Sequence, residues 1–425
     1  MQSVKFQEVR RLMKILLIVA NYIPEIGAAA HIYHDLGKAF VHRGHEVDVI
    51  TSYPREYNLI QTDKSKTFPL DEISDGINIH RCRHPALRDN IIFRGLEHFF
   101  LIHYYYKIYR KSGKKFDICI MYIPPLPLYY LAKKIKKVDG TPSILNFMDF
   151  HPQELTDVGV LRNPIIIKIL GYIERQAYKN ADFIIVSTAG GIEYITQRGG
   201  NPKKIIHIYN GAILSEIDSL FTKKDFKQRQ QISNKYLITY TGIFSPFQGL
   251  DRILDAAKAL RDNDDLVFYM VGDGMSKKHL QSRINEEHIE NVRLLPLQPR
   301  DEFFNIVSSS DLCLISLDER MKAPCFPGKT LNLLAAGKPI VAITEASGET
   351  ARIITEAGCG EVIEPNDTVA LQKAILQLFV SPQKGIIFGK RGREFFTKNM
   401  TLEKSVQSYE QIITQIITNG SKEVK

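Results

Sequence analysis

The feature that most constrains the fold is an alternation of short apolar runs with amphipathic segments. In the first half of the chain, the apolar run Lys14–Ala20 is followed by a helical pattern over His31–Arg43. Fully apolar strands that alternate with helices indicate a parallel sheet covered by helices on both faces. The other strands expected in this half are Val47–Thr51, Phe116–Met121, Ser143–Phe147, Asp182–Ser187 and Ile205–Ile208.

A polar segment rich in lysine and glutamine, residues 215–235, interrupts the alternation, which then restarts. The 425 residues suit two domains, because single cores stop growing at roughly 250–300 residues. We therefore expect two doubly wound α/β domains facing a central cleft, over residues 13–214 and 236–395. The final amphipathic segment, 396–425, is expected to pack back on the first domain. Strands of the second half are expected at Tyr236–Thr241, Leu266–Val271, Val292–Leu295, Leu312–Leu317, Pro339–Ile343 and Gly360–Ile363.

The start of the chain imitates a signal peptide, because Arg10, Arg11 and Lys14 precede the apolar run ILLIVA. This run is short for such a signal and a helical pattern follows it at once, so we interpret it as a buried first strand. Residues 1–12 are then an extension. Five cysteines without CxxC spacing predict neither a disulfide framework nor a zinc site, and they fit a reducing cytosol.

Much of the net charge of +9 lies between Arg81 and Lys115, where nine basic residues accompany two acidic ones. Aromatic residues are interleaved with this charge, and the combination suits an anionic membrane surface. The alternative is a solvated basic helix whose aromatic side chains face the core. Nucleic acid is not expected as a partner, because no module signature for it accompanies the stretch. The aromatic residues are Phe93, Phe99, Phe100, Tyr104, Tyr105, Tyr106 and Tyr109.

Three strand-to-loop junctions combine glycine with small or polar residues. Turns of this kind expose backbone N–H groups that can receive a phosphate, although tight packing alone would also select small residues. The first junction, NYIPEIGAAA, lacks the spacing of a dinucleotide fingerprint, which counts against NAD. The candidate donor-binding residues in the three junctions are Gly27 and Ala28; Gly242, Phe244, Ser245, Gln248 and Gly249; and Gly272 and Asp273.

A fourth candidate is FPGKTLNLLAAGKPIVAI, Phe326–Ile343, which predicts a turn, a short helix and a strand. Thr330 is expected to cap the helix, whose first amides would face a diphosphate together with the Lys329 ammonium group. An ordinary capped helix is the alternative. The residues proposed to bind the donor are Gly328, Lys329, Thr330, Leu331 and Asn332.

With these motifs in place, the chain resembles the retaining GT-B glycosyltransferases of family 4, in particular bacterial enzymes of O-antigen, capsule and exopolysaccharide synthesis. The resemblance rests on the order and spacing of PEIGAAA, RGHEVDVIT, ADFIIVST, IYNG, GIFSPFQGLDRILDAA, VGDG and PGKTLNLLAAGKPIVA. It implies two Rossmann-like domains, a UDP- or GDP-sugar in the second and an acceptor on the first. It also implies that no metal or other cofactor is required.

The sequence departs from the family at the donor site. Many relatives have glutamate where Asn332 stands and another at the position of Pro324. Relatives often carry Arg and Lys in the loop that here offers Ser245 and Gln248. Lys329, in a PGK that resembles the PSK of one subgroup, is then the best remaining cation for the phosphates.

Catalytic residues are expected in NFMDFHPQE, residues 146–154, which follows a first-domain strand and so lies at the cleft. The candidates are Asp149, His151 and Glu154; a helix cap or an ion pair is the alternative for Asp149. In a retaining transfer the donor phosphate can take the acceptor proton, so the protein mainly positions groups and stabilises charge. The DxD-like run Asp262–Asp265 lies in a polar link, and no residue is assigned to a metal.

The sequence thus predicts a cytoplasmic glycosyltransferase, peripheral on the inner face of the membrane, that moves a sugar from a nucleotide diphosphate, preferably UDP, to a glycan or polyprenyl-linked acceptor. A nucleotide-sugar epimerase of the same shape is one alternative, and a nucleotide-sugar-binding protein without catalysis is another. Neither the sugar nor the linkage is specified.

Overall fold

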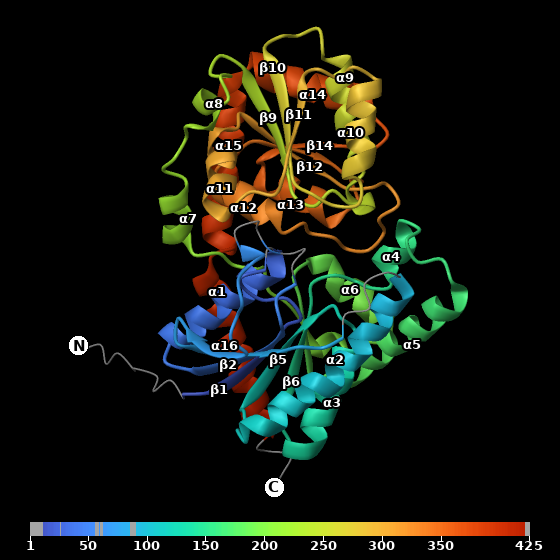
Figure 1. The fold of residues 1–425 in the computed structure, drawn as a ribbon, viewed down its shortest axis with the longest axis vertical. Coiled ribbons are helices and arrows are strands. Elements are labelled where there is room, and N and C mark those ends of the chain that lie inside the picture. Colours follow the sequence, from blue (N-terminus) through green and yellow to red (C-terminus); the bar gives the residue numbers. More distant parts are fainter. Residues whose placement is uncertain (1–11, 26, 56–58, 60–62, 86–90, 421–425) are drawn as a thin grey trace, which may run out of the picture.

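The computed structural model describes residues 12–420, apart from 26, 56–58, 60–62 and 86–90. Two α/β domains are stacked along the long axis, with the first domain below the second in Figure 1. The predicted fold class, two doubly wound sheets, is confirmed. Residues 1–11 of the expected extension 1–12, and the middle of the basic stretch, 86–90, lie outside the described residues.

The first domain is built on an eight-stranded sheet in the order β3-β4-β2-β1-β5-β6-β7-β8. All neighbours are parallel except β3 and β4, which form an antiparallel hairpin at one edge that the sequence pattern did not indicate. The strands are β1 Lys14–Ile18, β2 Glu46–Ser52, β3 Asp71–Ser74, β4 Ile77–Cys82, β5 Ile118–Ile123, β6 Ser143–Phe147, β7 Phe183–Val186 and β8 Ile205–His207.

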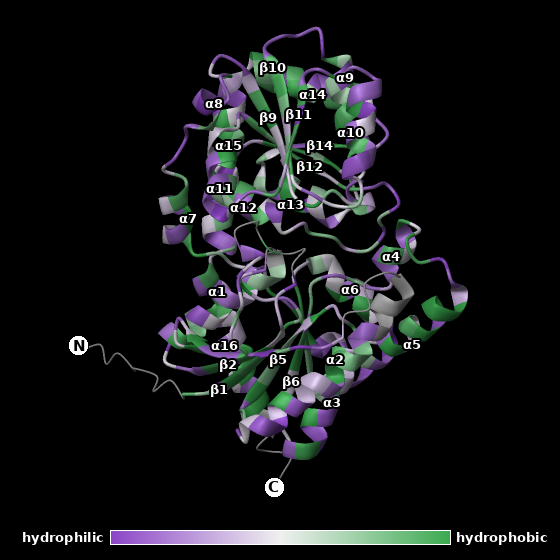
Figure 2. Ribbon diagram, in the orientation of Figure 1, coloured by the Kyte–Doolittle hydropathy of each residue, from purple (hydrophilic) through white to green (hydrophobic). Residues whose placement is uncertain are grey.

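Both faces of this sheet are covered, which explains why its strands are apolar on both sides. On β1, Leu16 and Ile18 belong to one core cluster and Ile15 and Leu17 to the other. Figure 2 shows these apolar strands inside and polar bands on the outer helices. One face carries α1 Ala28–His42 and α16 Leu402–Gly420; the other carries α2 Ile91–Ser112, α3 Leu128–Asp139, α5 Pro164–Asn180 and α6 Ala189–Gln197.

The C-terminal helix α16 leaves the second domain and packs on the first. Its Ile413 is fully buried in the core beside α1, and the Tyr409 hydroxyl accepts a 2.9 Å hydrogen bond from Asn146 at the centre of the sheet. The chain crosses back where Gly211 meets Leu402, and a Cβ at Gly211 would lie 2.4 Å from the Leu402 Cα. A residue without a side chain is therefore needed at this crossing.

The second domain is a six-stranded, fully parallel sheet in the order β11-β10-β9-β12-β13-β14. Its strands are β9 Tyr236–Thr241, β10 Leu266–Val271, β11 Val292–Leu295, β12 Leu312–Ser316, β13 Ile340–Ile343 and β14 Gly360–Ile363. One face carries α9 Asp251–Ala259, α10 Lys277–Glu286 and α14 Thr368–Val380. The other carries α11 Arg300–Ser309, α12 Lys329–Ala335, α13 Glu349–Ala357 and α15 Pro382–Asn399.

The structure gives detail to the segments between the expected domains. The linker 215–235 contains α8 Phe226–Arg229 and most of α7 Leu214–Leu220. The apolar side chains Ile217 and Phe226 from these helices are buried in second-domain clusters. The expected break at residue 396 falls inside α15, because this helix still packs on α12 and the return to the first domain begins only at α16.

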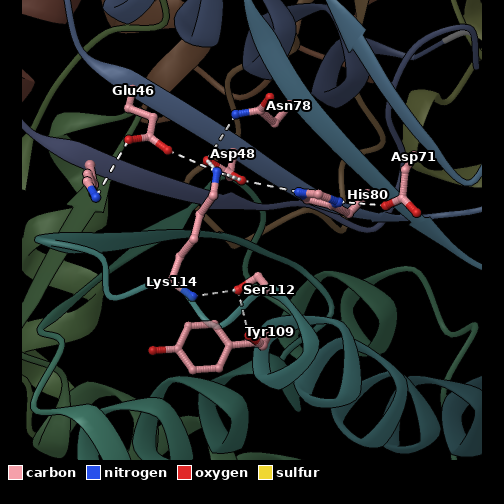
Figure 3. Close-up of polar contacts among 9 residues, drawn as sticks. Glu46, Asp48, Asp71, Asn78, His80, Tyr109, Ser112 and Lys114 are labelled. Atoms are coloured by element: carbon pink, nitrogen blue, oxygen red, sulfur yellow. Dashed lines mark hydrogen bonds and ion pairs between the residues drawn. The ribbon is translucent and has the colours of Figure 1, made fainter.

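The basic stretch Arg81–Lys115 is divided between the interior and the surface. Arg81 is buried on β4 and forms a 2.8 Å ion pair with Glu72. Lys114 bonds both Asp48 and Glu46 at 2.9 Å, in a network that also holds His80 (Figure 3). These two cations therefore hold the hairpin edge together and are not free for a membrane, contrary to the expectation for the whole stretch.

Candidate active site

The carboxyl ends of the strands of both domains meet at the boundary between the domains (Figure 1). In open parallel sheets, ligands bind beyond these strand ends, where loops carry the functional groups. The first domain contributes the loop after β6, which leads into the short helix α4 Gln153–Asp157. The second contributes the loops after β9 and β10 and the segment that begins α12.

Two carboxyl groups and a histidine cluster in the loop after β6. Asp149 is half-buried and accepts a hydrogen bond from the Tyr122 hydroxyl on β5. The Glu154 carboxylate is buried, accepts a 2.7 Å bond from the Phe150 amide and lies 3.8 Å from the His151 ring nitrogen. The arrangement brings together all three residues predicted to be catalytic.

The environment of this cluster disfavours charge. Loss of hydration raises the pKa of Glu154 to about 8, and the neighbouring Asp149 carboxylate adds to the rise. Burial likewise raises the pKa of Asp149 and lowers that of His151. Two nearby carboxyl groups in a dry site hold a proton between them at neutral pH, which is an arrangement found in acid–base sites.

Lys329 lies on the opposite side of the boundary, at the first position of α12. Its ammonium group donates a 3.0 Å hydrogen bond to the Gln248 side chain and lies 3.7 Å from the centre of the Tyr240 ring. Tyr240 donates to the same Gln248 oxygen at 3.0 Å. Among the described residues no carboxylate pairs with Lys329, and burial lowers its pKa well below the ordinary lysine value. Because this loss of hydration disfavours the charged form of the half-buried amine, an anionic partner would stabilise its charge.

Cys325 connects the two groups. Its half-buried thiol interacts electrostatically with Asp149 and Glu154 on one side and with Lys329 on the other. Burial raises the pKa of this thiol well above its ordinary value, so it stays protonated. The carboxyl cluster and the cation therefore border one site across the domain boundary.

Two further carboxylates tie the domains together beside this site. Asp157 on α4 accepts the backbone amides of Lys322 and Ala323 at 2.8 and 3.1 Å. In the reverse direction, Glu349 on α13 accepts the amides of Ala189 and Gly190 at 3.0 and 3.2 Å. Hydrogen bonds from Arg352 and from these amides overcome the effect of burial and hold the pKa of Glu349 below its ordinary value.

Comparison with known proteins identifies the architecture. Residues 27–211 match the family described as "Glycosyl transferase 4-like domain", and residues 221–395 match "Glycosyl transferases group 1". The chain belongs to the family 4 glycosyltransferases. Together the two matches cover both domains, and the boundary between them falls in α7 and the segment before it.

Three similar proteins show the range of these enzymes. The putative colanic acid biosynthesis glycosyl transferase WcaI of Escherichia coli K12 is 22% identical over 93% of this chain and 98% of its own length. An E. coli UDP-Gal:α-D-GlcNAc-diphosphoundecaprenol α-1,3-galactosyltransferase is 26% identical over 52% of this chain and 56% of its own length. Anabaena HepE, solved with UDP-glucose, shares the fold with a TM-score of 0.70 at 15% identity, over 95% and 100% of the two chains.

The glycosyltransferase places several predicted donor residues differently from the expectation. The Phe244 side chain is buried in the second-domain core, and its amide and carbonyl are bonded to Asp273 and Ser276. Leu331 also points into a core. A Cβ at Gly272 would lie 1.8 Å from the Gly242 oxygen, so this glycine permits two loops to touch. These residues support the site through core packing and loop contact, and the side chains of Phe244 and Leu331 do not face the donor.

Thr330 does not cap α12, contrary to the sequence prediction. Gly328 is the N-cap residue, and the Thr330 hydroxyl is buried without a hydrogen-bond partner among the described residues. The Thr330 amide already donates to Pro327 at 2.9 Å. The helix start therefore offers fewer free amides than expected. Asn332 lies one turn in and is half-buried.

The loop between β1 and α1 leaves space beside the backbone of Gly27. Gly27 is the N-cap residue of this helix, and a Cβ placed on it would meet no atom of the described residues within 4 Å. The side chain of Ala28 lies outside the described residues. In the second domain, Gly249 has a positive φ of 52° and ends the turn that contains Ser245 and Gln248. Gln248 is thereby directed to Lys329, as its hydrogen bond shows.

Sequence reasoning missed Tyr240, Cys325, Asp157 and Glu349. Tyr240 lies in an apolar strand, so its position predicts only a core residue. Cys325 belongs to no cysteine motif such as CxxC. Asp157 and Glu349 each act on the other domain, so only the way the domains meet reveals them. No local signal distinguishes them from ordinary helix carboxylates.

Proposed function

We propose that this glycosyltransferase moves a sugar from a UDP-sugar to a lipid-linked glycan, with retention of configuration, during synthesis of a surface polysaccharide. The observation that carries the proposal is the half-buried Lys329 ammonium group, without a carboxylate partner among the described residues, across the domain boundary from the carboxyl cluster. The named activities of the colanic acid and diphosphoundecaprenol relatives support the acceptor class. UDP-glucose in HepE supports the donor.

On the donor side, Lys329 neutralises the diphosphate as its charge grows during departure of the sugar. A preorganised cation in a dry site stabilises such charge without reorganisation of solvent. Gly242 stands beside it, because a Cβ there would lie 3.7 Å from the Lys329 ammonium nitrogen. Asn332 holds the ribose with an amide, where relatives use a carboxylate. With Lys329 in this role, the proposed transfer needs no divalent metal.

On the acceptor side, Asp149 orients the acceptor hydroxyl while the donor phosphate takes its proton. Tyr122 fixes the Asp149 carboxyl by a hydrogen bond. Glu154, protonated at neutral pH, donates a hydrogen bond into the site without adding a second negative charge. His151 completes the polar wall. Positioning and charge stabilisation thus account for the chemistry.

The glycosyltransferase is further proposed to work at the inner face of the cytoplasmic membrane. Within the described part of the basic stretch, α2 exposes Phe99 and Phe100 together with Lys107, Arg110 and Lys111. No helix in the described residues is long and apolar enough to span a bilayer. A surface association through aromatic and basic side chains fits this helix.

The test is a transfer assay with UDP-sugars and polyprenyl-diphosphate-linked glycans, run with wild type and with Asp149→Ala. Wild type should release UDP only when an acceptor is present, and the variant should lose at least about 100-fold in kcat while still binding donor. Conversion of the donor without acceptor would instead indicate an epimerase. Donor binding without any UDP release would indicate a protein without catalysis.

A further inference from the structure

Helix α5 exposes a ridge of apolar side chains. Ile165, Ile169 and Tyr172 are 69%, 53% and 56% exposed. Their spacing of four and three residues places them on one face of the helix. The opposite face is anchored, because Ile173, Ala177 and Tyr178 are buried in the first-domain core. The ridge therefore belongs to a fixed helix and faces outward.

Basic residues without acidic partners accompany the ridge. Lys168, Arg175 and Lys179 are exposed, and no ion pair in the described residues involves them. The single acidic residue of α5, Glu174, is buried and accepts a 2.9 Å bond from Tyr178. The outward part of α5 consequently combines apolar and positive groups and carries no negative charge.

The neighbouring helix extends this surface. The Asn180 side chain at the end of α5 bonds the Tyr129 hydroxyl on α3, and Tyr172 also interacts with Tyr129, so the two helices lie side by side. Four lysines of α3 are exposed, namely Lys133, Lys134, Lys136 and Lys137, of which Lys136 pairs with Asp182. Figure 2 shows α5 at the outer edge of the first domain with apolar and polar bands.

The helix also has a defined position relative to the active site. Asp149 lies in the loop before α4 and Glu154 lies in α4, and a short connection over residues 158–163 leads from α4 to α5. Asn163 caps α5 by accepting the amides of Ile165 and Ile166 at 3.0 and 3.2 Å, and Pro164 occupies the first turn. This cap fixes the direction in which the helix leaves the site.

We propose that α5 lies in the plane of an anionic bilayer surface, with Ile165, Ile169 and Tyr172 in the headgroup boundary and Lys168 and Arg175 on the lipid phosphates. Apolar insertion and electrostatic attraction act together in such helices. The helix of 17 residues is about 25 Å long, and it begins seven residues after α4 ends. The inference rests on the proposed function, because a lipid-linked acceptor must reach the cleft from this surface.

The charge favours a bilayer over a second copy of the chain. A self-complementary contact would bring identical basic residues together, whereas anionic lipids neutralise them. The surface is also distinct from Phe99 and Phe100 of α2. If the protein bound the membrane through α2 alone, the α5 ridge would stay exposed to water and its substitution would not change vesicle binding.

Vesicle flotation tests the proposal, with vesicles of equal parts phosphatidylglycerol and phosphatidylcholine compared with pure phosphatidylcholine. Wild type should bind the anionic vesicles only, and less at high salt. The triple change Ile165→Ser, Ile169→Ser, Tyr172→Ser should lower partitioning at least about tenfold. Lys168→Gln with Arg175→Gln should lower it about fivefold per cation.

Matched controls lie on the second domain. Val369, Val380 and Ile387 are also exposed apolar residues, and Lys373 and Lys390 are exposed lysines. Serine at the first three, or glutamine at the two lysines, should leave vesicle binding unchanged. Thermal unfolding of each variant verifies that the fold is kept. Equal losses in the control and α5 variants would overturn the proposal.

The two proposals fail separately. If wild type transfers sugar but binds no anionic vesicles, or binds them equally well without the ridge, the α5 assignment is wrong and the proposed function stands. If vesicles bind through α5 but no UDP-sugar binds, the proposed function fails. A wild-type dimer in light scattering that the ridge variant converts to monomer would make this face a self-interface, which also overturns the lipid assignment.

Discussion

At the residue scale, Lys329 supplies to the donor site a positive charge that the loop with Ser245 and Gln248 lacks. The resemblance to family 4 implies cations in the loop that here carries Ser245 and Gln248, and it left Lys329 as the best remaining cation for the phosphates. In the fold, Lys329 reaches this loop from α12 and bonds Gln248 directly. The motif PGK was predictable, but its contact with a residue 81 positions away was not. The two meet because the start of α12 lies against the loop that follows β9.

Glu154 provides a prediction about stability and pH. Its pKa is about 8 in the folded chain and ordinarily 4.5. Below pH 4.5 both states hold the proton, so the shift has no effect; as pH rises toward 8, only the unfolded state releases it and stability falls. Glu154→Gln keeps an acceptor for the Phe150 amide and should flatten this decline, by on the order of 3 kcal/mol at pH 8.

Urea unfolding of wild type and Glu154→Gln at pH 5 and pH 8 checks this prediction. The two proteins should be similar at pH 5, with the variant more stable at pH 8. Glu193→Gln, on the neighbouring helix α6, is a suitable control, since this side chain is exposed and accepts a hydrogen bond from Gln197 four residues on. A wild type that gains stability over the same interval would contradict the assigned protonation.

At the element scale, periodicity predicted the buried strands because a parallel sheet covered on both faces requires apolar residues at every position. It did not reveal β3 and β4. The hairpin lies at the sheet edge, where β3 alternates exposed and half-buried residues and Asp48, His80 and Lys114 replace apolar contacts. Strands stabilised by such polar contacts lack the pattern on which the prediction depends.

Helix α16 acts as a brace between the domains, which makes its buried face important for the first domain. Ile413→Ala should destabilise the chain by about 3 kcal/mol, because a fully buried side chain is lost from a core shared with α1. Thr414→Ala, on the exposed side of the same helix, should change stability by less than about 0.5 kcal/mol. Thermal denaturation separates the two, and similar losses in both would argue against the brace.

At the scale of the whole molecule, the two domains are held by reciprocal bonds from Asp157 and Glu349. The doubly wound architecture and its cleft follow from the repeated pattern, whereas the contacts that close the cleft join segments more than 150 residues apart. No periodic signal encodes such contacts. The sequence therefore predicts where chemistry occurs better than it predicts how the domains are held around it.

Removal of both carboxylates should loosen the closed arrangement. Asp157→Ala with Glu349→Ala leaves four backbone amides without these acceptors, so the domains should separate in the absence of donor. Small-angle X-ray scattering should show a larger radius of gyration for the double variant than for wild type. The pair Asp255→Ala with Glu287→Ala, whose ion pairs with Arg283 lie within the second domain, serves as control. An unchanged radius would show that other contacts hold the domains.

The central claim, that Lys329 binds the donor diphosphate, is tested most directly by calorimetric titration of UDP. Lys329→Ala should weaken UDP binding about 10- to 100-fold, the loss expected for one charge-assisted hydrogen bond. Lys390→Ala, a change of equal charge on the exposed side of α15, should have no effect. If UDP binds Lys329→Ala as tightly as wild type, the donor site lies elsewhere and the account is wrong.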